Sequence, residues 1–251
     1  MISASALFVG NPTIDLKTVD STNDYAAALI SKKTISDGLV ICANSQTAGK
    51  GQMGSQWLTA QGKNLTLSII LKPKSLHIKY QFYLSIITAL SIRDLLRKYH
   101  INSKVKWPND IYVKSNKIAG ILIQNTLIRS NIEYSIIGMG ININQESFDS
   151  SIANPTSFLL ETNKSYNLIE VRKDLYSCFE SYYIDLKEGR FKSLIAEYRD
   201  SMYQKNEVRS YQMLDGSIVN GIIRDVQENG LLDIEIDDSI QSFSLKELSF
   251  V

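Results

Sequence analysis

Four polar stretches interrupt the apolar pattern of this chain, and each carries groups that could meet a ligand. The first is STN at 21–23, whose hydroxyl and amide groups can serve a ligand or simply cap a helix. The second is the glycine-rich run QTAGKGQMGSQW at 46–57. The third is KWPNDIYVKSNKIAGILIQ at 106–124, and the fourth is GMGININ at 138–144. Their lysines, amides and backbone N–H groups suit an anion and a neutral polar ring.

The glycine-rich run has the spacing G-x-G-x-x-G at Gly49, Gly51 and Gly54, directly after an apolar stretch. A dinucleotide fingerprint is not favoured, because the following SQWLTAQGKN starts no helix and no acidic residue closes a βαβ unit. Glycines still allow backbone amides to approach an anion closely. Lys50 adds a cation and Trp57 a flat surface for a ring. A mobile surface loop is the competing interpretation of this run alone.

The bend KWPND offers a second set of polar groups between two β-prone runs. Pro108 stiffens the bend and favours an extended conformation at Trp107. Asp110 could hold Mg²⁺ as a hard oxygen ligand, with Asn109 beside it. The residue types of this bend therefore allow a metal ligand between the two β-prone runs.

Lys117 opens the next β-prone run and is followed by Ala119 and Gly120, so little side-chain bulk hides its ammonium. Such a cation can neutralise a carboxylate or phosphoryl oxygen, although a lone lysine at a turn is more often only exposed. In the fourth stretch, alternation with isoleucines directs Asn142 or Asn144 toward a ligand, unless both simply end the strand.

The elements around these stretches predict an α+β fold. Paired strands joined by tight turns indicate a mixed or antiparallel sheet with helices on one side. Short strands with Asp-Gly and Asn-Gly turns after residue 206 indicate a small β-barrel. We expect a larger domain at 1–203 and a small one at 204–251 that leans on it. The predicted strands include 39–44 and 65–71. The predicted helices are YAAALI after the cap at 21–24, then 77–99, 168–188 and 191–203.

Composition narrows the function further. A formal net charge of +1 over 251 residues argues against wholesale binding to nucleic acid or anionic membranes. Cys42 and Cys178 lie in apolar contexts and are expected to be buried, reduced thiols of a cytoplasmic protein. His77 and His100 have no spacing typical of a zinc site. The N-terminal MISASALFVGNP lacks the features of a signal peptide, and no apolar run is long enough to cross a membrane.

Taken together and in this order, the four stretches resemble those of biotin–protein ligases. That family carries a Ser-Thr-Asn entry, a GRGRxGxxW-like loop, KWPND, a Lys-x-x-Gly-Ile-Leu strand and a Gly-x-Gly-Ile-Asn strand. Here they stand as STN, GKGQMGSQW, KWPND, KIAGIL and GMGIN, and the resemblance spans residues 10–251. It implies the class II synthetase-like biotin/lipoate ligase fold, with a mixed or antiparallel sheet, helices packed on it, and a small C-terminal SH3-like β-barrel.

The resemblance implies that biotin and ATP form biotinyl-5′-AMP with Mg²⁺, and that biotin then passes to a lysine of a biotin carboxyl carrier domain. It implies a short form without the DNA-binding domain of longer members, because the first motif begins at residue 21. No membrane partner is expected, and a homodimer stays open. A lipoate–protein ligase of the same fold and a non-catalytic biotin or nucleotide sensor are the alternatives. KWPND and the terminal β-domain favour biotin over lipoate.

Site residues follow from the same resemblance. Lys117 is the expected catalytic cation, touching both the biotin carboxylate and the α-phosphate. Lys50 and Gln52 stand where the family often carries arginines. Lys50 keeps the positive charge but cannot make the paired hydrogen bonds of a guanidinium, and Gln52 has no charge. The loop is expected to order over the adenylate. Biotin is expected to meet Ser21, Thr22, Asn23, Gln46, Gly49, Lys50, Gly51, Gln52, Lys117 and Gly120; ATP or the adenylate is expected to meet Lys50, Gln52, Trp57, Lys106, Asn109 and Asn142; Asp110 is the expected Mg²⁺ ligand.

Overall fold

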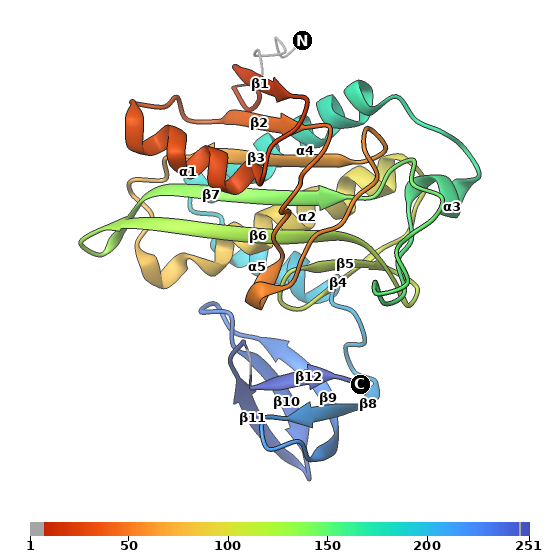
Figure 1. Cartoon of the computed structure of the whole chain (residues 1–251). Coiled ribbons are helices and arrows are strands. Elements are labelled where there is room, and N and C mark those ends of the chain that lie inside the picture. The colour runs from red at the N-terminus through yellow and green to blue at the C-terminus, as the bar shows by residue number, and fades with distance from the viewer. Residues whose placement is uncertain (1–7, 246) are drawn as a thin grey trace, which may run out of the picture.

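A seven-stranded mixed sheet forms the centre of the larger part of the molecule (Figure 1). The structure is a computed structural model that describes residues 8–245 and 247–251. Only β1 and β2 run parallel, and every other neighbouring pair of this sheet is antiparallel. The strands, in spatial order, are β1 (Thr13–Leu16), β2 (Leu39–Ala43), β3 (Leu65–Leu71), β7 (Asn131–Ile141), β6 (Asn116–Ile128), β5 (Asp110–Val113) and β4 (Lys104–Lys106).

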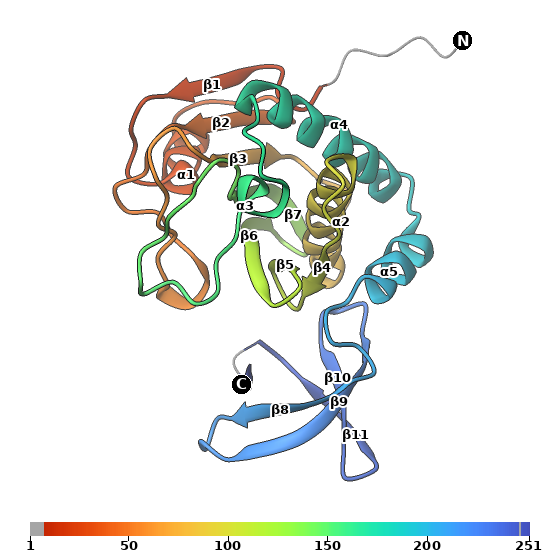
Figure 2. The same ribbon diagram turned by 90° about the vertical axis from the view of Figure 1, so that its right-hand side faces the viewer.

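Helices cover both faces of this sheet, which corrects the expectation of helices on one side. Figure 2 shows α1 (Thr22–Lys32) on one side and α2 (Phe82–Lys98) and α4 (Leu168–Lys187) on the other. Ile41, Ile70 and Ile136 pack with Ala26 of α1 in a small separate cluster. Their neighbours along the strands point the opposite way, into the main core. The central strands are apolar at nearly every position because both of their faces are buried.

The remaining helices differ in detail from the predicted spans. The predicted helix 77–99 consists of a short 3₁₀ turn (Ile78–Tyr80) followed by α2. The helix expected at 191–203 is α5 (Phe191–Asp200), and a short α3 (Phe158–Thr162) was not predicted. The N-terminus of α1 is capped as expected, because Ser21 Oγ accepts a hydrogen bond from Asp24 N at 3.4 Å. No helix among the described residues is both long and apolar enough to cross a bilayer.

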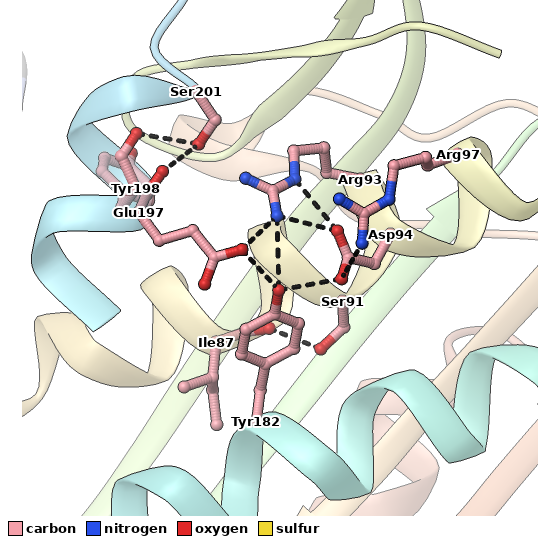
Figure 3. A network of polar contacts seen from close by, with 9 residues as sticks. All are labelled: Ile87, Ser91, Arg93, Asp94, Arg97, Tyr182, Glu197, Tyr198 and Ser201. Atoms are coloured by element: carbon pink, nitrogen blue, oxygen red, sulfur yellow. Dashed lines mark hydrogen bonds and ion pairs between the residues drawn. The ribbon is translucent and has the colours of Figure 1, made fainter. Parts of the chain in front are cut away.

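A polar network joins three helices on the face of the sheet opposite α1 (Figure 3). Tyr182 of α4 lies at its centre, 2.9 Å from Asp94 Oδ2 and 2.8 Å from Glu197 Oε1. Arg93 of α2 bridges the same two carboxylates. Burial and the adjacent carboxylates raise the pKa of Tyr182, so the phenol stays protonated and donates. The network fixes α2, α4 and α5 as one layer behind the sheet.

A five-stranded antiparallel sheet makes up the C-terminal part, as predicted for a small β-domain. The chain turns tightly between its strands, and Asp237 and Asp238 both have positive φ in a two-residue hairpin loop. The strands, in spatial order, are β11 (Ser239–Phe243), β10 (Leu232–Ile236), β9 (Ile218–Val226), β8 (Val208–Met213) and β12 (Leu248–Phe250).

This small sheet lies beside the edge of the large sheet formed by β4 and β5 (Figure 1). Its buried side chains, including Tyr211 and Val226, join the same apolar cluster as the main core. Trp107 Nε1 donates a hydrogen bond of 2.9 Å to Gly230 O. Arg199 of α5 donates to Val226 O and pairs with Asp225 at 2.7 Å. The small sheet therefore leans on the larger part, as expected for a unit with little core of its own.

Candidate active site

The four polar stretches converge on one cavity of about 310 Å³. Its walls come from the start of α1, the glycine-rich loop, the KWPND bend, the first half of β6 and the last part of β7. The C-terminal sheet closes one side with residues that follow β11. Predicted site residues that line it are Ser21, Thr22, Asn23, Gln46, Lys50, Gly51, Gln52, Trp57, Asn109, Asp110, Lys117 and Gly120.

The polar end of the cavity is built on the first turn of α1. Gln46 Oε1 accepts a hydrogen bond of 2.8 Å from Thr22 N, which ties the loop to the helix start. Ser68 of β3 lies 2.7 Å from Thr22 Oγ1 and 2.7 Å from Asn23 Oδ1. Ser21, Thr22 and Asn23 are each at least 97% buried, so neutral groups here are held in place rather than solvated.

Glycines on β6 and β7 make room for the ring of Trp57. Gly120 and Gly140 are partners across the two strands. A Cβ at Gly140 would lie 2.1 Å from Trp57 Cε2, and one at Gly120 would lie 3.1 Å from Trp57 Cζ3. The indole therefore lies directly on the backbone of the sheet. Its Nε1 is buried and forms no hydrogen bond within the described part of the chain.

The glycine-rich loop is a small hairpin closed over the cavity. Gly51 N donates to Ser55 O at 2.7 Å, and Trp57 N donates to Gly49 O at 2.9 Å. Gly49 is required at the base, because a Cβ there would lie 2.4 Å from Trp57 O. Lys50 pairs with Asp24 of α1 at 2.7 Å, and this ion pair holds the hairpin against the helix.

Lys117 brings a positive charge into the centre of the cavity. Its Nζ lies 2.7 Å from Asp110 Oδ1 and 5.6 Å from the centre of the Trp57 ring. The side chain passes over Gly120, where a Cβ would lie 3.4 Å from Lys117 Cε. The ammonium and the carboxylate are 28% and 20% exposed, so both are partly screened from water. The pair leaves a cation that an incoming anion can reach.

The KWPND bend is fixed from both sides. Asn109 Nδ2 donates to Ile121 O at 2.9 Å, and Ile121 N donates back to Asn109 O at 2.9 Å. Lys106 lies over the rings of Tyr112 and Phe250, with its Nζ 4.7 Å and 4.8 Å from their centres. Burial lowers the pKa of the Lys106 ammonium and raises that of the Tyr112 phenol to about 12.

Three predicted site residues do not line the cavity. Asn142 is buried, and its Nδ2 donates a hydrogen bond of 2.9 Å to Thr156 O, so its amide supports the loop before α3. Gly49 lies at the base of the hairpin, and Lys106 lies behind the bend against the C-terminal sheet. Lys106 itself therefore does not reach the cavity, although the residues that follow it in the KWPND bend do line it.

Sequence reasoning missed two parts of the wall. Thr66 of β3 lines the cavity, and Ser68 lies behind Thr22. Both are polar residues inside the otherwise apolar strand LTLSIIL, and that interruption is a signal that could have been used. The second part of the wall comes from the C-terminal sheet, more than a hundred residues further along the chain. No local sequence pattern predicts that these residues line the cavity. They are Leu245, Leu248, Ser249 and Phe250.

Asp110 has the chemistry to hold Mg²⁺. Its Oδ1 is buried and forms no hydrogen bond with the described residues, although it lies 2.7 Å from the Lys117 ammonium. Asn109, the preceding residue, has an amide oxygen that could serve as a second ligand. No cluster of three or more His, Cys, Asp or Glu side chains occurs among the described residues. A single carboxylate is enough for Mg²⁺ in a nucleotide site, because phosphates and waters supply most of the ligands there.

The fold is an α+β domain with a mixed sheet, and its polar cavity is closed on one side by the small C-terminal sheet. The chain belongs to the biotin/lipoate A/B protein ligase family, whose model matches residues 16–142. The resemblance to biotin–protein ligases is thereby confirmed.

Solved structures and curated relatives agree. A biotin protein ligase from Aquifex aeolicus in complex with biotin and ATP is 27% identical, with a TM-score of 0.80 over 94% of this chain and 97% of that one. The biotin–[acetyl-CoA-carboxylase] ligase of Mycobacterium tuberculosis is 25% identical over 86% of this chain and 80% of its own. The bifunctional ligase/repressor BirA of Escherichia coli is 32% identical over 58% of this chain and 44% of its own. The chain spans about half the length of several curated relatives that it matches, including BirA of Escherichia coli.

Proposed function

We propose that this protein is an ATP-dependent biotin–protein ligase. It activates biotin as biotinyl-5′-AMP and transfers biotin to a lysine of a biotin carboxyl carrier domain. The observation that carries the proposal is the position of the Lys117 ammonium. It lies between a neutral polar end at Ser21, Thr22 and Gln46 and the acidic bend at Asp110. The Aquifex aeolicus relative, which binds biotin and ATP, supports the same pair of substrates.

The first half-reaction joins two anions. A carboxylate oxygen of biotin attacks the α-phosphorus of ATP, and the bond from that phosphorus to the bridging oxygen of the β-phosphate breaks to release pyrophosphate. The repulsion between carboxylate and phosphate must be offset by a positive group held in place beforehand. Lys117 is positioned to do this, because its ammonium is fixed by Asp110 and by the Trp57 face.

Asp110, with Asn109, would hold Mg²⁺ beside the phosphates, and the ion would supply further charge neutralisation there. Lys117, which pairs with Asp110 at 2.7 Å, would keep its ammonium directed at the same part of the cavity.

The second half-reaction needs no nucleophile from this chain. The amine of the acceptor lysine attacks the acyl carbon, AMP leaves, and the amine loses its proton. The mixed anhydride is sensitive to water, so the hairpin at 46–57 should shield it. The ion pair between Lys50 and Asp24 supplies one contact that closes this lid.

A streptavidin blot tests the proposal. The purified chain is mixed with biotin, ATP, Mg²⁺ and a carrier domain, beside a Lys117→Ala variant and a Lys173→Ala control on the exposed side of α4. Label on the carrier is expected with the wild type and the control, and is expected to be nearly lost with Lys117→Ala. Absence of label with the wild type would contradict the proposal.

Lipoate is the competing substrate within the same family. Pyrophosphate exchange with biotin and with lipoate, run side by side, separates the two activities. Exchange with lipoate alone would identify a lipoate ligase, whereas binding of biotin with no exchange would indicate a sensor.

A further inference from the structure

The backbone of Lys117 is held by a loop that comes much later in the chain. β7 ends at Ile141, which pairs with Ala119 of β6, so Lys117 lies beyond the last residue of β7. The loop before α3 takes the place of β7 there. Lys117 N donates to Asn154 O at 2.7 Å, and Thr156 N donates to Lys117 O at 2.9 Å. Both backbone polar groups of Lys117 are therefore bonded to this loop.

Thr156 is buried and is the best-fixed residue of this loop. Its Oγ1 donates a hydrogen bond of 2.6 Å to Glu161 Oε1 of α3. Its carbonyl oxygen accepts one of 2.9 Å from Asn142 Nδ2. With its N–H bonded to Lys117, Thr156 makes a hydrogen bond through each of its three polar groups. It cannot shift without breaking one of them, so its position sets that of the Lys117 backbone.

Glu161 holds the side chain of Thr156 from α3. A hydroxyl that donates to a carboxylate makes a short, charge-assisted hydrogen bond, which is stronger than a neutral one. The other oxygen of the same carboxylate, Oε2, lies 3.8 Å from Lys114 Nζ, and the two side chains are 14% and 83% exposed. An ion pair of this length to an exposed ammonium contributes little. The bond to Thr156 is therefore the stronger of these two contacts.

The position of the Lys117 backbone matters because the ammonium lies at the end of a flexible stem of four carbons. Its far end meets Asp110 and the Trp57 ring, at 2.7 Å and 5.6 Å. The stem is thus held at both ends, by the loop at the backbone and by these two residues at the ammonium. A displacement of about 1 Å at such a group can lower a rate by about 10²-fold.

We propose that Glu161 is a positioning residue for the first half-reaction: through Thr156 it fixes the backbone of Lys117 and so directs the ammonium at the reacting oxygens. This inference rests on the proposed function and deepens it. Glu161 and Thr156 are not among the residues that line the active-site cavity. Both act through Lys117 and do not need to touch a substrate.

Matched substitutions at two threonines test the inference. Thr162 of α3 donates to Phe158 O at 2.7 Å and accepts from Tyr166 at 3.0 Å, so Thr162→Val removes a bonded hydroxyl that has no link to Lys117. Thr156→Val should lower the kcat of biotin-dependent pyrophosphate exchange about tenfold, with little change in the KM for biotin or ATP, because the ammonium acts in the transition state. Thr156→Ser keeps the hydroxyl and should stay close to the wild type. A loss of kcat in Thr162→Val as large as in Thr156→Val would overturn the inference.

Substitutions of Glu161 separate the hydrogen bond from the charge. Glu161→Gln keeps an oxygen that can accept from Thr156, and Glu161→Ala does not. The glutamine variant should recover most of the kcat that the alanine variant loses. Lys114→Ala removes only the exposed ion pair and should exchange like the wild type. A glutamine variant as slow as the alanine variant, or a Lys114→Ala as slow as either, would assign the effect to charge and overturn the inference.

Double variants with Lys117→Ala give a readout that a general loss of stability would not move. If Thr156 acts through the ammonium, Thr156→Val should hardly lower the residual exchange of Lys117→Ala, because the group it positions is already gone. An equal loss in both backgrounds would overturn the inference. Glu161→Ala gives the same cycle if Thr156→Val does not fold. If the wild type shows no exchange with biotin, the proposed function itself fails. If the wild type exchanges normally and Thr156→Val is as fast, the inference alone is wrong.

Discussion

The Lys117 ammonium lies 2.7 Å from Asp110 Oδ1, and the two residues come from neighbouring antiparallel strands. The positive charge that should meet the substrates is thus already paired with a carboxylate of the same chain. A substrate anion must therefore compete with Asp110 for this cation, unless the carboxylate is drawn to another positive charge.

Loss of the Lys117 ammonium should be strongly damaging, and a different cation at this position should not replace it. Lys117→Ala is expected to lower biotin-dependent pyrophosphate exchange by a factor on the order of 10²–10³, as for other charge-stabilising donors. Lys117→Arg should recover little, because the planar guanidinium does not reproduce a compact ammonium over Gly120. Activity of Lys117→Ala close to that of the wild type would show that another group supplies the charge.

Asp110→Asn should affect the two substrates in opposite ways. Without the competing carboxylate, biotin alone is expected to bind at least as tightly as to the wild type. Exchange that depends on Mg²⁺ and ATP is expected to fall by about tenfold or more, because a hard oxygen ligand is lost. Calorimetry with biotin and exchange kinetics with ATP measure the two effects. Equal weakening of both substrates would mean that Asp110 mainly orders the site.

Gly140→Ala should expel the Trp57 ring, since the new Cβ would lie 2.1 Å from Trp57 Cε2. The hairpin at 46–57 would lose its anchor on the sheet, and trypsin should cut it after Lys50 several times faster than in the wild type. Biotin with ATP should slow cleavage of the wild type more than that of the variant. A double variant with Trp57→Ala should be no more sensitive than Trp57→Ala alone, because the clash is then absent.

Trp107→Phe removes the hydrogen bond from the KWPND bend to Gly230 O of the small sheet. The loss of one such bond should cost about 1 kcal/mol, or a Tm lower by about 2–4 °C. The KM for ATP should rise as well, because the bend carries Asn109 and Asp110. Arg199→Met breaks a second link to the small sheet, at Val226, and does not alter a cavity wall. Its Tm should fall without a change in the KM for ATP.

Tyr112 should make the stability of the protein sensitive to alkali. Burial raises the pKa of its phenol to about 12 in the folded state, against about 10 in the unfolded chain. The stability contribution is therefore fully present below about pH 10 and is lost as the pH rises through about 12. Urea unfolding of the wild type and of Tyr112→Phe should give parallel stabilities up to about pH 9.5, with the wild type falling faster above it.

The sequence was informative wherever chemistry depended on spacing along the chain. The cap at Ser21 and the strand that starts near Lys117 follow from local rules. The hairpin formed by the glycine-rich run was not predicted, because that run has no strand periodicity. The class of fold followed from the cadence of strands and is confirmed. The position of α1 on the opposite face was missed, although the continuously apolar strands LVICA and LTLSIIL are typical of a sheet covered on both sides.

Other features depend on contacts that no local pattern contains. Alternation left open whether Asn142 faces a ligand, and the carbonyl of Thr156 decided its direction. Leu248 and Phe250 reach the cavity only because the small sheet packs against the bend. The link between Ser68 and the first turn of α1 joins residues about fifty positions apart, so it emerges only when the sheet is assembled.

The burial of both cysteines makes the protein suited to site-specific labelling. Cys42 and Cys178 are buried, and burial raises the pKa of each thiol, so both should react slowly with maleimides at neutral pH. A cysteine introduced at the exposed Ser55 would then take up a fluorophore selectively. Opening and closing of the hairpin could be followed in real time without first removing either native thiol.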